Sequence, residues 1–208
     1  MSWNAPKSPF IDFKKSVFYK AGEVSEFIYQ IGEYRQLRET SKNVPIKDIK
    51  SADFKAKVKY LKECLIKYRK ITGYGRGITA VQIGIPENFS VIYTPEKLII
   101  IINPKITKKS EKMLSYPEMC MSANPIIVPT IRPAWVEFDY YDEGGKLQHW
   151  NTKDNTDLGK IMNRVFQHEI DHMEGIINID KTKNPKEIIL ESDPNFYIST
   201  TFKEIKSI

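Results

Sequence analysis

Apolar residues recur at three- and four-residue spacing between residues 53 and 70, which is the period of one face of an α-helix. That stripe consists of Phe54, Val58, Leu61, Leu65 and Tyr68. We therefore predict a helix over residues 53–70, with Cys64 beside the stripe as a small buried or half-buried residue. An earlier helix is predicted over residues 23–40.

The middle of the chain changes to short apolar runs that are typical of β-strands. Gly73, Gly75 and Gly77 first interrupt the helical pattern and predict a tight loop. Strands are then predicted over residues 90–93, 98–103, 126–128, 135–141 and 147–150. The last two are separated by the turn sequence DEGG at positions 142–145, which indicates a β-hairpin.

One clear helix follows these strands. It begins near Asn155 or Thr156, both good N-cap residues, and Gly175 is a natural residue just past its C-terminus. Its apolar positions are Leu158, Ile161, Met162, Val165, Phe166 and Ile170. Strands first and a helix late favour an α+β fold, with short mixed or antiparallel strands packed around this central helix.

Composition is that of an ordinary globular protein. The 208 residues suit one domain, and 41% hydrophobic and 28% charged residues are close to average values. Only Cys64 and Cys120 are cysteines, so no disulfide framework is expected, and a reducing compartment would leave Cys120 free as a thiolate. The N-terminal segment resembles neither a secretory signal nor an arginine-rich transit peptide. A cytoplasmic location is expected, and an organellar one stays open.

The net charge of +6 does not predict a nucleic-acid-binding protein. Lysines alternate with acidic residues, as in YLKECLIKYRK, and no nucleic-acid-binding motif is present. Loose attraction to an acidic surface such as a ribosome stays open. The longest apolar run, residues 98–102, has the length of a buried strand, far below the roughly 18 residues of a membrane span. We expect a monomer without membrane segments.

The late helix carries the candidate chemistry in the sequence QHEIDH at positions 167–172. His168 and His172 lie one turn apart on one helical face, within reach of a single metal ion. Ile161 and Val165 share this face, so the histidines should point into the protein. Glu169 is turned about 100° from His168, and the HExxH pattern pairs two ligands with a carboxylate that takes a proton from bound water.

A catalytic site of this kind needs a third protein ligand. Cys120 is the obvious candidate, in a local turn before a strand, whereas His149 reads as a surface or strand residue. A purely structural role for buried, hydrogen-bonded histidines is the alternative. Asp171 either orients a neighbour of the metal site or is a solvated helix residue, and Tyr116 and Trp150 read as core residues.

Three segments together resemble the peptide deformylase family. GRGITAVQ at positions 75–82 is similar to the family pattern G-x-G-L-A-A-x-Q, and EMCMS at 118–122 to E-G-C-L-S. QHEIDH at 167–172 is similar to Q-H-E-x-D-H. The order and spacing match, and the similarity extends over residues 27–182. With it the chain divides into an extension (1–20), a deformylase-like catalytic domain (21–182) and a C-terminal tail (183–208).

The resemblance implies a function and a set of roles. Cys120, His168 and His172 would bind one divalent metal ion, natively Fe²⁺, with Zn²⁺, Ni²⁺ or Co²⁺ as substitutes. Glu169 would act as general base and then general acid, while Gln82 and the backbone N–H of Met121 hold the oxyanion. The substrates would be N-formylated nascent peptides. The residues facing the peptide would be Gly75, Arg76, Gly77 and Met119.

The chain departs from the family pattern at several positions. Met119 replaces a glycine before the cysteine, which would cost about 1 kcal/mol or more if φ had to be positive there, and its side chain would reshape the substrate groove. Thr79 replaces an alanine. An arginine that many relatives carry after the cysteine is missing, and Arg76 and Arg132 are candidate substitutes.

These departures leave three hypotheses. The first is removal of the formyl group from formylmethionyl peptides. The second is hydrolysis of another formamide or small amide, motivated by Met119 and the missing arginine. The third is a metal-binding relative without turnover, motivated by the basic charge.

Overall fold

The computed structural model describes residues 22–190 and 202–205. The predicted extension, residues 1–20, and most of the predicted tail lie outside this part of the chain. Within it, no helix combines the length and the hydropathy that crossing a membrane requires.

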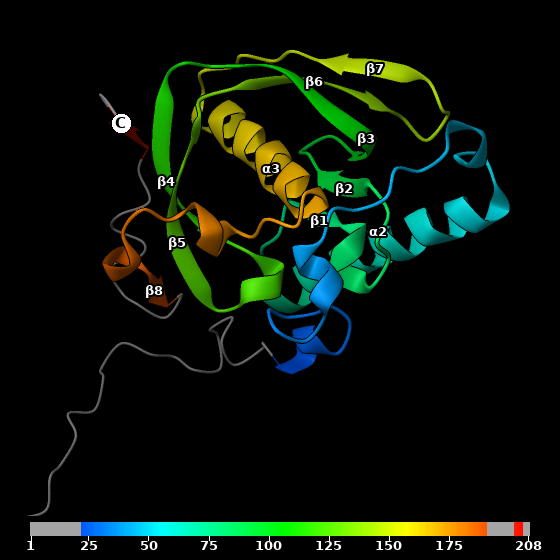
Figure 1. Cartoon of the computed structure of the whole chain (residues 1–208), viewed down its shortest axis with the longest axis horizontal. Helices are drawn as coiled ribbons and strands as arrows, with labels where there is room; N and C mark the ends of the chain where they lie inside the picture. The colour runs from blue at the N-terminus through cyan, green and yellow to red at the C-terminus, as the bar shows by residue number, and fades with distance from the viewer. Residues whose placement is uncertain (1–21, 191–201, 206–208) are drawn as a thin grey trace, which may run out of the picture.

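Two antiparallel sheets surround the helix α3, Asp157–Met173 (Figure 1). The five-stranded sheet has, in spatial order, β1 (Gly77–Thr79), β2 (Phe89–Tyr93), β3 (Leu98–Lys109), β6 (Val136–Tyr141) and β7 (Leu147–Trp150). The four-stranded sheet has β8 (Ile189–Leu190), β5 (Ile126–Pro133), β4 (Met113–Met119) and β9 (Lys203–Ile205). The α+β prediction with a central helix is therefore confirmed.

The sequence around α3 explains where this helix begins and ends. The Thr156 hydroxyl caps its N-terminus by accepting from the backbone N–H of Gly159. At the other end, Gly175 has a φ of 76°, and its N–H donates to the carbonyl of His172 while that of Ile176 donates to Asp171. This is a Schellman motif, as Gly175 predicts. Both predicted ends are confirmed.

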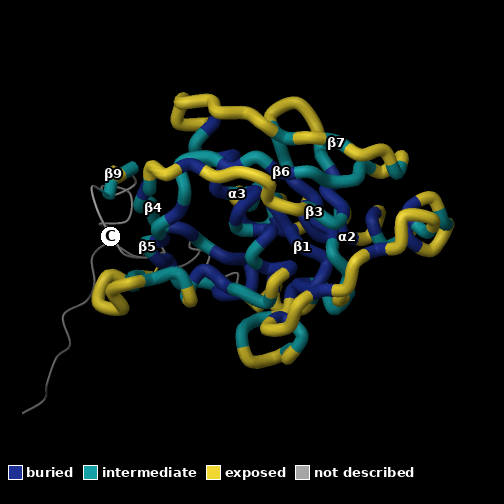
Figure 2. The backbone as a smooth tube through the Cα atoms, turned by 45° about the horizontal axis from the view of Figure 1, so that its top comes forward, coloured by how far each residue is buried: buried dark blue, intermediate teal, exposed yellow. Residues whose placement is uncertain are grey.

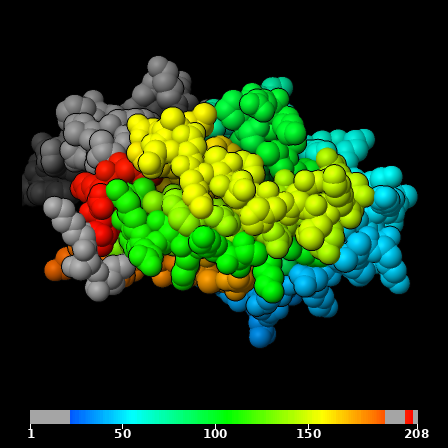
Figure 3. Space-filling model, turned by 90° about the horizontal axis from the view of Figure 1, so that it is seen from above, coloured from blue at the N-terminus to red at the C-terminus, as the bar shows by residue number. Residues whose placement is uncertain are grey.

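The buried side of α3 packs against the five-stranded sheet. Met162, Phe166 and Ile170 form one core cluster with Phe138 of β6, and the Phe138 and Phe166 rings lie 5.1 Å apart. Buried residues gather around the helix and on the inner sides of both sheets, while exposed residues mark the loops (Figure 2). Seen from above, the β6–β7 hairpin forms part of the outer surface (Figure 3).

The helix α2, Ala52–Thr72, covers β1 and β2 at the other end of that sheet. Ser51 caps it, and Gly73 ends it with a φ of 80°. Every residue of the predicted apolar stripe is buried, and so is Cys64. The Phe54 ring meets Phe89 of β2 edge to face at 4.9 Å. The prediction over residues 53–70 is confirmed.

The helix predicted over residues 23–40 is wrong. Only residues 22–25 are helical before a series of turns and the 3-10 helix η1, Arg35–Arg38. Backbone groups here bond to distant segments: the N–H of Tyr29 donates to Gln82, and that of Ile31 to Ser122. Gly32, with a φ of 89°, adds a turn that interrupts a continuous helix.

The strands are more extensive than the apolar runs predict. β3 continues to Lys109 and β5 to Pro133, in both cases beyond the predicted ends. The local turn predicted around Cys120 begins only at that residue, because residues up to Met119 belong to β4. Proline obscured this strand: Pro117 lies opposite Pro129 of β5 in the register.

Candidate metal centre and active site

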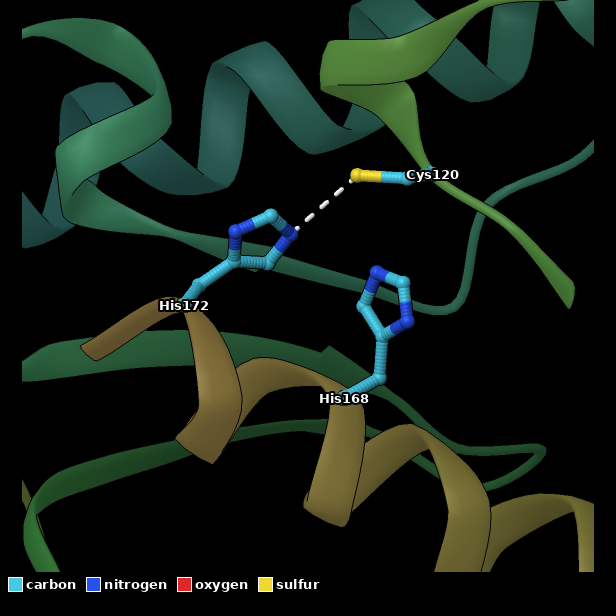
Figure 4. A group of neighbouring side chains, drawn as sticks. All are labelled: Cys120, His168 and His172. Carbon is cyan, nitrogen blue, oxygen red and sulfur yellow. Dashed lines mark hydrogen bonds between the residues drawn. The ribbon is translucent and has the colours of Figure 1, made fainter. Parts of the chain in front are cut away.

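The end of β4 and the C-terminal half of α3 bring three potential metal ligands together. Cys120 directly follows β4 and precedes the 3-10 helix η4, Met121–Ala123. Each of the residues Cys120, His168 and His172 offers one ligand atom, and these three atoms lie within 4.8 Å of one another. The Sγ of Cys120 is 3.2 Å from Nε2 of His172. Figure 4 shows all three side chains pointing toward one another, the histidines from successive turns of α3.

The donor set fits a divalent transition metal ion. One thiolate and two imidazoles are the ligands that zinc and iron sites of this size use, with one position left open. Burial alone would lower the pKa of His168, but Cys120 and Glu118 raise it well above its ordinary value. A centre that stabilises positive charge in this way suits a cation. Burial, then the neighbouring His168, lowers the pKa of His172 and keeps it neutral.

A buried ionic network holds His168 from behind. Oε2 of Glu118 lies 3.3 Å from Nδ1 of His168, which leaves Nε2 for the centre. Glu118 also accepts from Nε of Arg132 at 2.9 Å and from Nε of Arg164 at 2.7 Å. Burial alone would raise the pKa of Glu118, but the two guanidiniums hold it well below its ordinary range.

Asp171 belongs to this network. Its Oδ2 accepts from Nη1 of Arg132 at 2.5 Å, and Lys181 lies 3.1 Å from Oδ1. Of the two roles left open for Asp171, the structure therefore supports the ordering of a neighbour. Arg132 is buried in these contacts, so it does not replace the missing arginine in the groove.

Glu169 lies on the opposite side of the centre, beside β1. Its Oε2 accepts from the hydroxyl of Thr79 at 2.7 Å. Burial raises the pKa of this carboxyl group, while the charge of His168 and the Thr79 hydrogen bond oppose the shift. A buried carboxylate with a raised pKa is suited to accept and return a proton near neutral pH.

Gln82 and Met121 approach the centre from two 3-10 helices. Gln82 belongs to η3, Ala80–Ile83, and its Oε1 accepts from the backbone N–H of Thr79 at 2.8 Å. The amide is thereby oriented with Nε2 toward Ser122, whose hydroxyl it reaches at 3.1 Å. Both Gln82 and Met121 line the cavity in front of His168 and Glu169.

This cavity has a volume of about 190 Å³ and is largely apolar. All four residues predicted to face a peptide line it, namely Gly75, Arg76, Gly77 and Met119. Ile161 and Val165 line it together with His168, as their shared helical face predicts. Tyr116 also lines it, so its prediction as a core residue is wrong, whereas Trp150 packs against Phe138 and Phe166 as predicted.

The model of the family described as "Polypeptide deformylase" matches residues 27–187. The chain belongs to this family. The deformylase family is metal-dependent, and the Cys120, His168 and His172 group could hold the ion. The resemblance seen in the three sequence motifs is thereby confirmed.

Individual deformylases show how far the similarity extends. A peptide deformylase of Picosynechococcus sp. is 34% identical over 123 residues, which are 57% of this chain and 62% of that protein. The match thus spans about three fifths of that relative. A peptide deformylase of Prochlorococcus marinus is 28% identical over 183 residues, with 85% and 83% of the two chains covered.

Solved structures of deformylases share the fold. A probable peptide deformylase from Synechococcus phage S-SSM7 has a TM-score of 0.62 and 29% identity, with 74% of this chain and 97% of that chain covered. The deformylase of Thermotoga maritima has a TM-score of 0.65 and 25% identity, with 76% and 97% covered.

The structure changes the interpretation of three positions in the deformylase motifs. Met119 lies within β4 opposite Ile127. In the described part of the chain, Asn103 is the one non-glycine residue with positive φ, so Met119 does not have the backbone strain that a positive φ would cause. Gly75 and Gly77 make room for side chains of this chain. A Cβ at Gly75 would meet Met121 at 2.6 Å, and one at Gly77 would meet Glu169 at 2.7 Å.

Sequence reasoning missed two groups of this site. Glu118 lies in the EMCMS motif, and its role follows from its spacing: two positions before Cys120 in an extended segment, its side chain points to the same side as the ligand. Thr79 was noted only as a departure from an alanine. The available signal is the hydroxyl of Thr79 in an otherwise apolar segment, six residues after Gly73, the first of three closely spaced glycines.

Proposed function

We propose that this chain removes the N-formyl group from the N-terminal formylmethionine of nascent polypeptides. The observation that carries the proposal is the convergence of the Cys120, His168 and His172 group with Glu169 in one apolar cavity. Membership of the deformylase family supports the same reaction. The products would be formate and a peptide with a free amino group.

Cys120, His168 and His172 would hold one divalent ion, with Fe²⁺ as the native metal and Zn²⁺, Ni²⁺ or Co²⁺ as substitutes. A divalent ion bound there would supply hydroxide at neutral pH, since it lowers the pKa of its bound water toward about 7. Glu118 would keep His168 oriented through its Nδ1. The donor set and the charge around it support this assignment.

Glu169 would take the proton of the attacking water and return it to the nitrogen as the formamide C–N bond breaks. Its raised pKa supports both steps. The amide Nε2 of Gln82 and the backbone N–H of Met121 would donate to the oxygen on which charge develops. A donor of this kind contributes on the order of 3 kcal/mol to transition-state stability.

Gly75, Arg76, Gly77 and Met119 would form the wall that receives the peptide. The largely apolar lining suits a methionine side chain. We keep a monomer and a cytoplasmic location as predictions; a relative from Arabidopsis thaliana carries the name "chloroplastic/mitochondrial". Loose attraction to the ribosome through the net charge of +6 belongs to the same proposal.

Hydrolysis of another formamide is a second candidate, favoured by the Met119 side chain in the cavity wall. A panel of formylated amines and peptides distinguishes these two candidate functions. Preference for formyl-Met-Ala-Ser supports the first, and preference for a formylated amine without methionine supports the second.

The decisive experiment purifies the protein without oxygen, measures its metal content and follows amine release from formyl-Met-Ala-Ser. Glu169→Ala is assayed alongside, with Glu174→Ala, an exposed residue at the end of the same helix, as the matched control. We expect one metal ion per chain in all three proteins and loss of turnover in Glu169→Ala alone. A fully loaded wild-type protein that leaves every formylated compound intact would support the non-catalytic hypothesis.

A further inference from the structure

Thr79 connects the two side chains to which the proposed reaction assigns proton transfer and oxyanion binding. It is the last residue of β1 and lies opposite Ser90 of β2 in the antiparallel register. Its hydroxyl is 2.7 Å from Oε2 of Glu169 and 2.6 Å from the hydroxyl of Ser90. Thr79 and Ser90 are completely buried, so water does not compete for these bonds.

The direction of the hydrogen bonds follows from counting protons. A carboxylate only accepts, and a threonine hydroxyl has a single proton to donate. Thr79 therefore donates to Oε2 of Glu169, and Ser90 donates to Thr79. The backbone carbonyl of Glu169, at 3.2 Å, is the longer contact and the weaker competitor for the same proton.

This arrangement makes the two oxygens of Glu169 unequal. Oε2 is engaged by the hydroxyl pair, while Oε1 lies above Gly77, where only a glycine leaves room for the carboxylate. Gly77 and Glu169 both line the cavity. Oε1 is thus the oxygen left to exchange a proton with a substrate.

The backbone of the same residue orients Gln82. The N–H of Thr79 donates to Oε1 of Gln82 at 2.8 Å, so the amide presents its Nε2 to the side of Ser122 and the cavity. One residue therefore fixes a carboxylate through its side chain and an amide through its main chain. The family pattern has alanine at this position, which supplies only the second contact.

We infer that Thr79, supported by Ser90, is a positioning residue that selects Oε1 of Glu169 as the proton-transferring oxygen. The inference rests on the proposed function, because it assigns to Glu169 the transfer of a proton. It concerns the turnover step and not the affinity for the peptide, since neither hydroxyl needs to touch the substrate.

Thr79→Val and Thr79→Ser test this inference. Valine keeps the branched shape and removes the hydroxyl, whereas serine keeps the hydroxyl and removes a methyl group. A hydrogen bond to a charged group is worth enough to change a rate by about ten- to a hundred-fold. We expect that loss in kcat for Thr79→Val on formyl-Met-Ala-Ser, with KM within about twofold, and recovery of kcat to within about threefold for Thr79→Ser. Equal kcat in valine and serine variants would overturn the inference.

Crystal structures of the metal-loaded wild type and Thr79→Val provide a readout that does not depend on activity. We expect the Glu169 carboxylate to be single and anchored in the wild type, and rotated or in two orientations in the valine variant. An unchanged carboxylate in the variant would overturn the inference. If the wild type leaves formyl-Met-Ala-Ser intact, the proposed function fails, and the carboxylate orientation alone still decides whether Thr79 positions Glu169.

Discussion

Gly77 lies directly against the carboxyl group of Glu169: a Cβ at position 77 would be 2.7 Å from both Cγ and Cδ of Glu169. No real Cβ atom approaches another carbon so closely, so either the strand β1 or the carboxyl group would have to move. The glycine at the start of β1 therefore determines where the carboxylate on α3 can be.

Gly77→Ala should displace the Glu169 carboxyl group and lower kcat on formyl-Met-Ala-Ser by at least about a hundred-fold, because a displacement near 1 Å can cost that much. The metal content should stay at one ion per chain, since the three atoms nearest to a Cβ at Gly77 all belong to Glu169 and not to a metal ligand. Gly22→Ala is the matched control, because a Cβ there meets nothing within 4 Å. Full activity in Gly77→Ala would contradict the steric argument.

The parts of the fold that the sequence predicts are those with a strong local pattern. The stripe from Phe54 to Tyr68 identifies α2, and the cap at Thr156 with the glycine at 175 identifies α3. The ligands on α3 are predicted because helical spacing places residues i and i+4 together. Cys120 could be assigned because few cysteines and histidines were available to complete the set.

What the sequence does not predict depends on contacts between distant segments. β4 contains Pro117 and pairs with β5 and β9, and its alternation is too weak to show this. Residues 26–40 do not form one continuous helix, because the backbone N–H groups of Tyr29 and Ile31 donate to carbonyl groups of η3 and η4. The contacts from Glu118 to Arg164 and from Thr79 to Glu169 join residues 46 and 90 positions apart, so neither has a local signal.

Glu118→Gln should destabilise the metal-free protein by about 3–5 kcal/mol, because it leaves Arg164 buried without its counter-charge and Arg132 with Asp171 alone. The pKa of Glu118 is lowered in the folded state, so its stabilisation is present above its unfolded pKa of about 4.3 and is lost as the pH falls through the folded value. Thermal unfolding of wild type and variant from pH 7 down to pH 3 measures this: the difference in Tm should shrink with acidification.

Glu63→Gln is the control for that comparison, since Glu63 is largely exposed and its nearest cation, Lys59, is 3.9 Å away. Surface pairs of this kind contribute little, so its Tm should follow that of the wild type at every pH. A Tm difference for Glu118→Gln that grows toward low pH would show that the sign of the linkage is wrong.

The two cysteines allow a direct test of the metal centre. Cys120→Ala should lower the metal bound after purification to well below one ion per chain, because two imidazoles alone form an incomplete site. Cys64→Ala should keep the full metal content, as Cys64 belongs to the core cluster around α2 and Cys120 belongs to a different cluster. Metal analysis after dialysis against a chelator measures both. Equal metal content in the two variants would remove Cys120 from the ligand set.

Gly175→Ala should destabilise the protein more than Gly73→Ala, although both glycines end a helix with positive φ. At Gly73 a Cβ meets nothing within 4 Å, so the variant bears only the backbone strain of about 1 kcal/mol. At Gly175 a Cβ would lie 2.6 Å from the backbone of Arg38, which forces α3 and η1 apart. Urea unfolding measures the free energy of unfolding of both variants. Similar decreases in the two variants would show that η1 can shift away from Gly175 without loss of stability.

Arg76 is a cation in the wall of the cavity. Arg164 lines the same cavity but donates to Glu118 and to backbone carbonyls, whereas Arg76 has no side-chain hydrogen bond or ion pair among residues 22–190 and 202–205. Arg76→Ala should therefore raise KM for formyl-Met-Ala-Ser about fivefold with kcat unchanged, consistent with a partly exposed charge pair of about 1 kcal/mol. The same peptide with an amidated C-terminus should show a smaller change in KM, because it lacks the carboxylate.

Arg35→Ala is the control, since the Arg35 side chain is 89% exposed and forms a surface ion pair with Glu39. An equal rise in KM for both peptides would assign to Arg76 a packing role in place of a charge-recognition role.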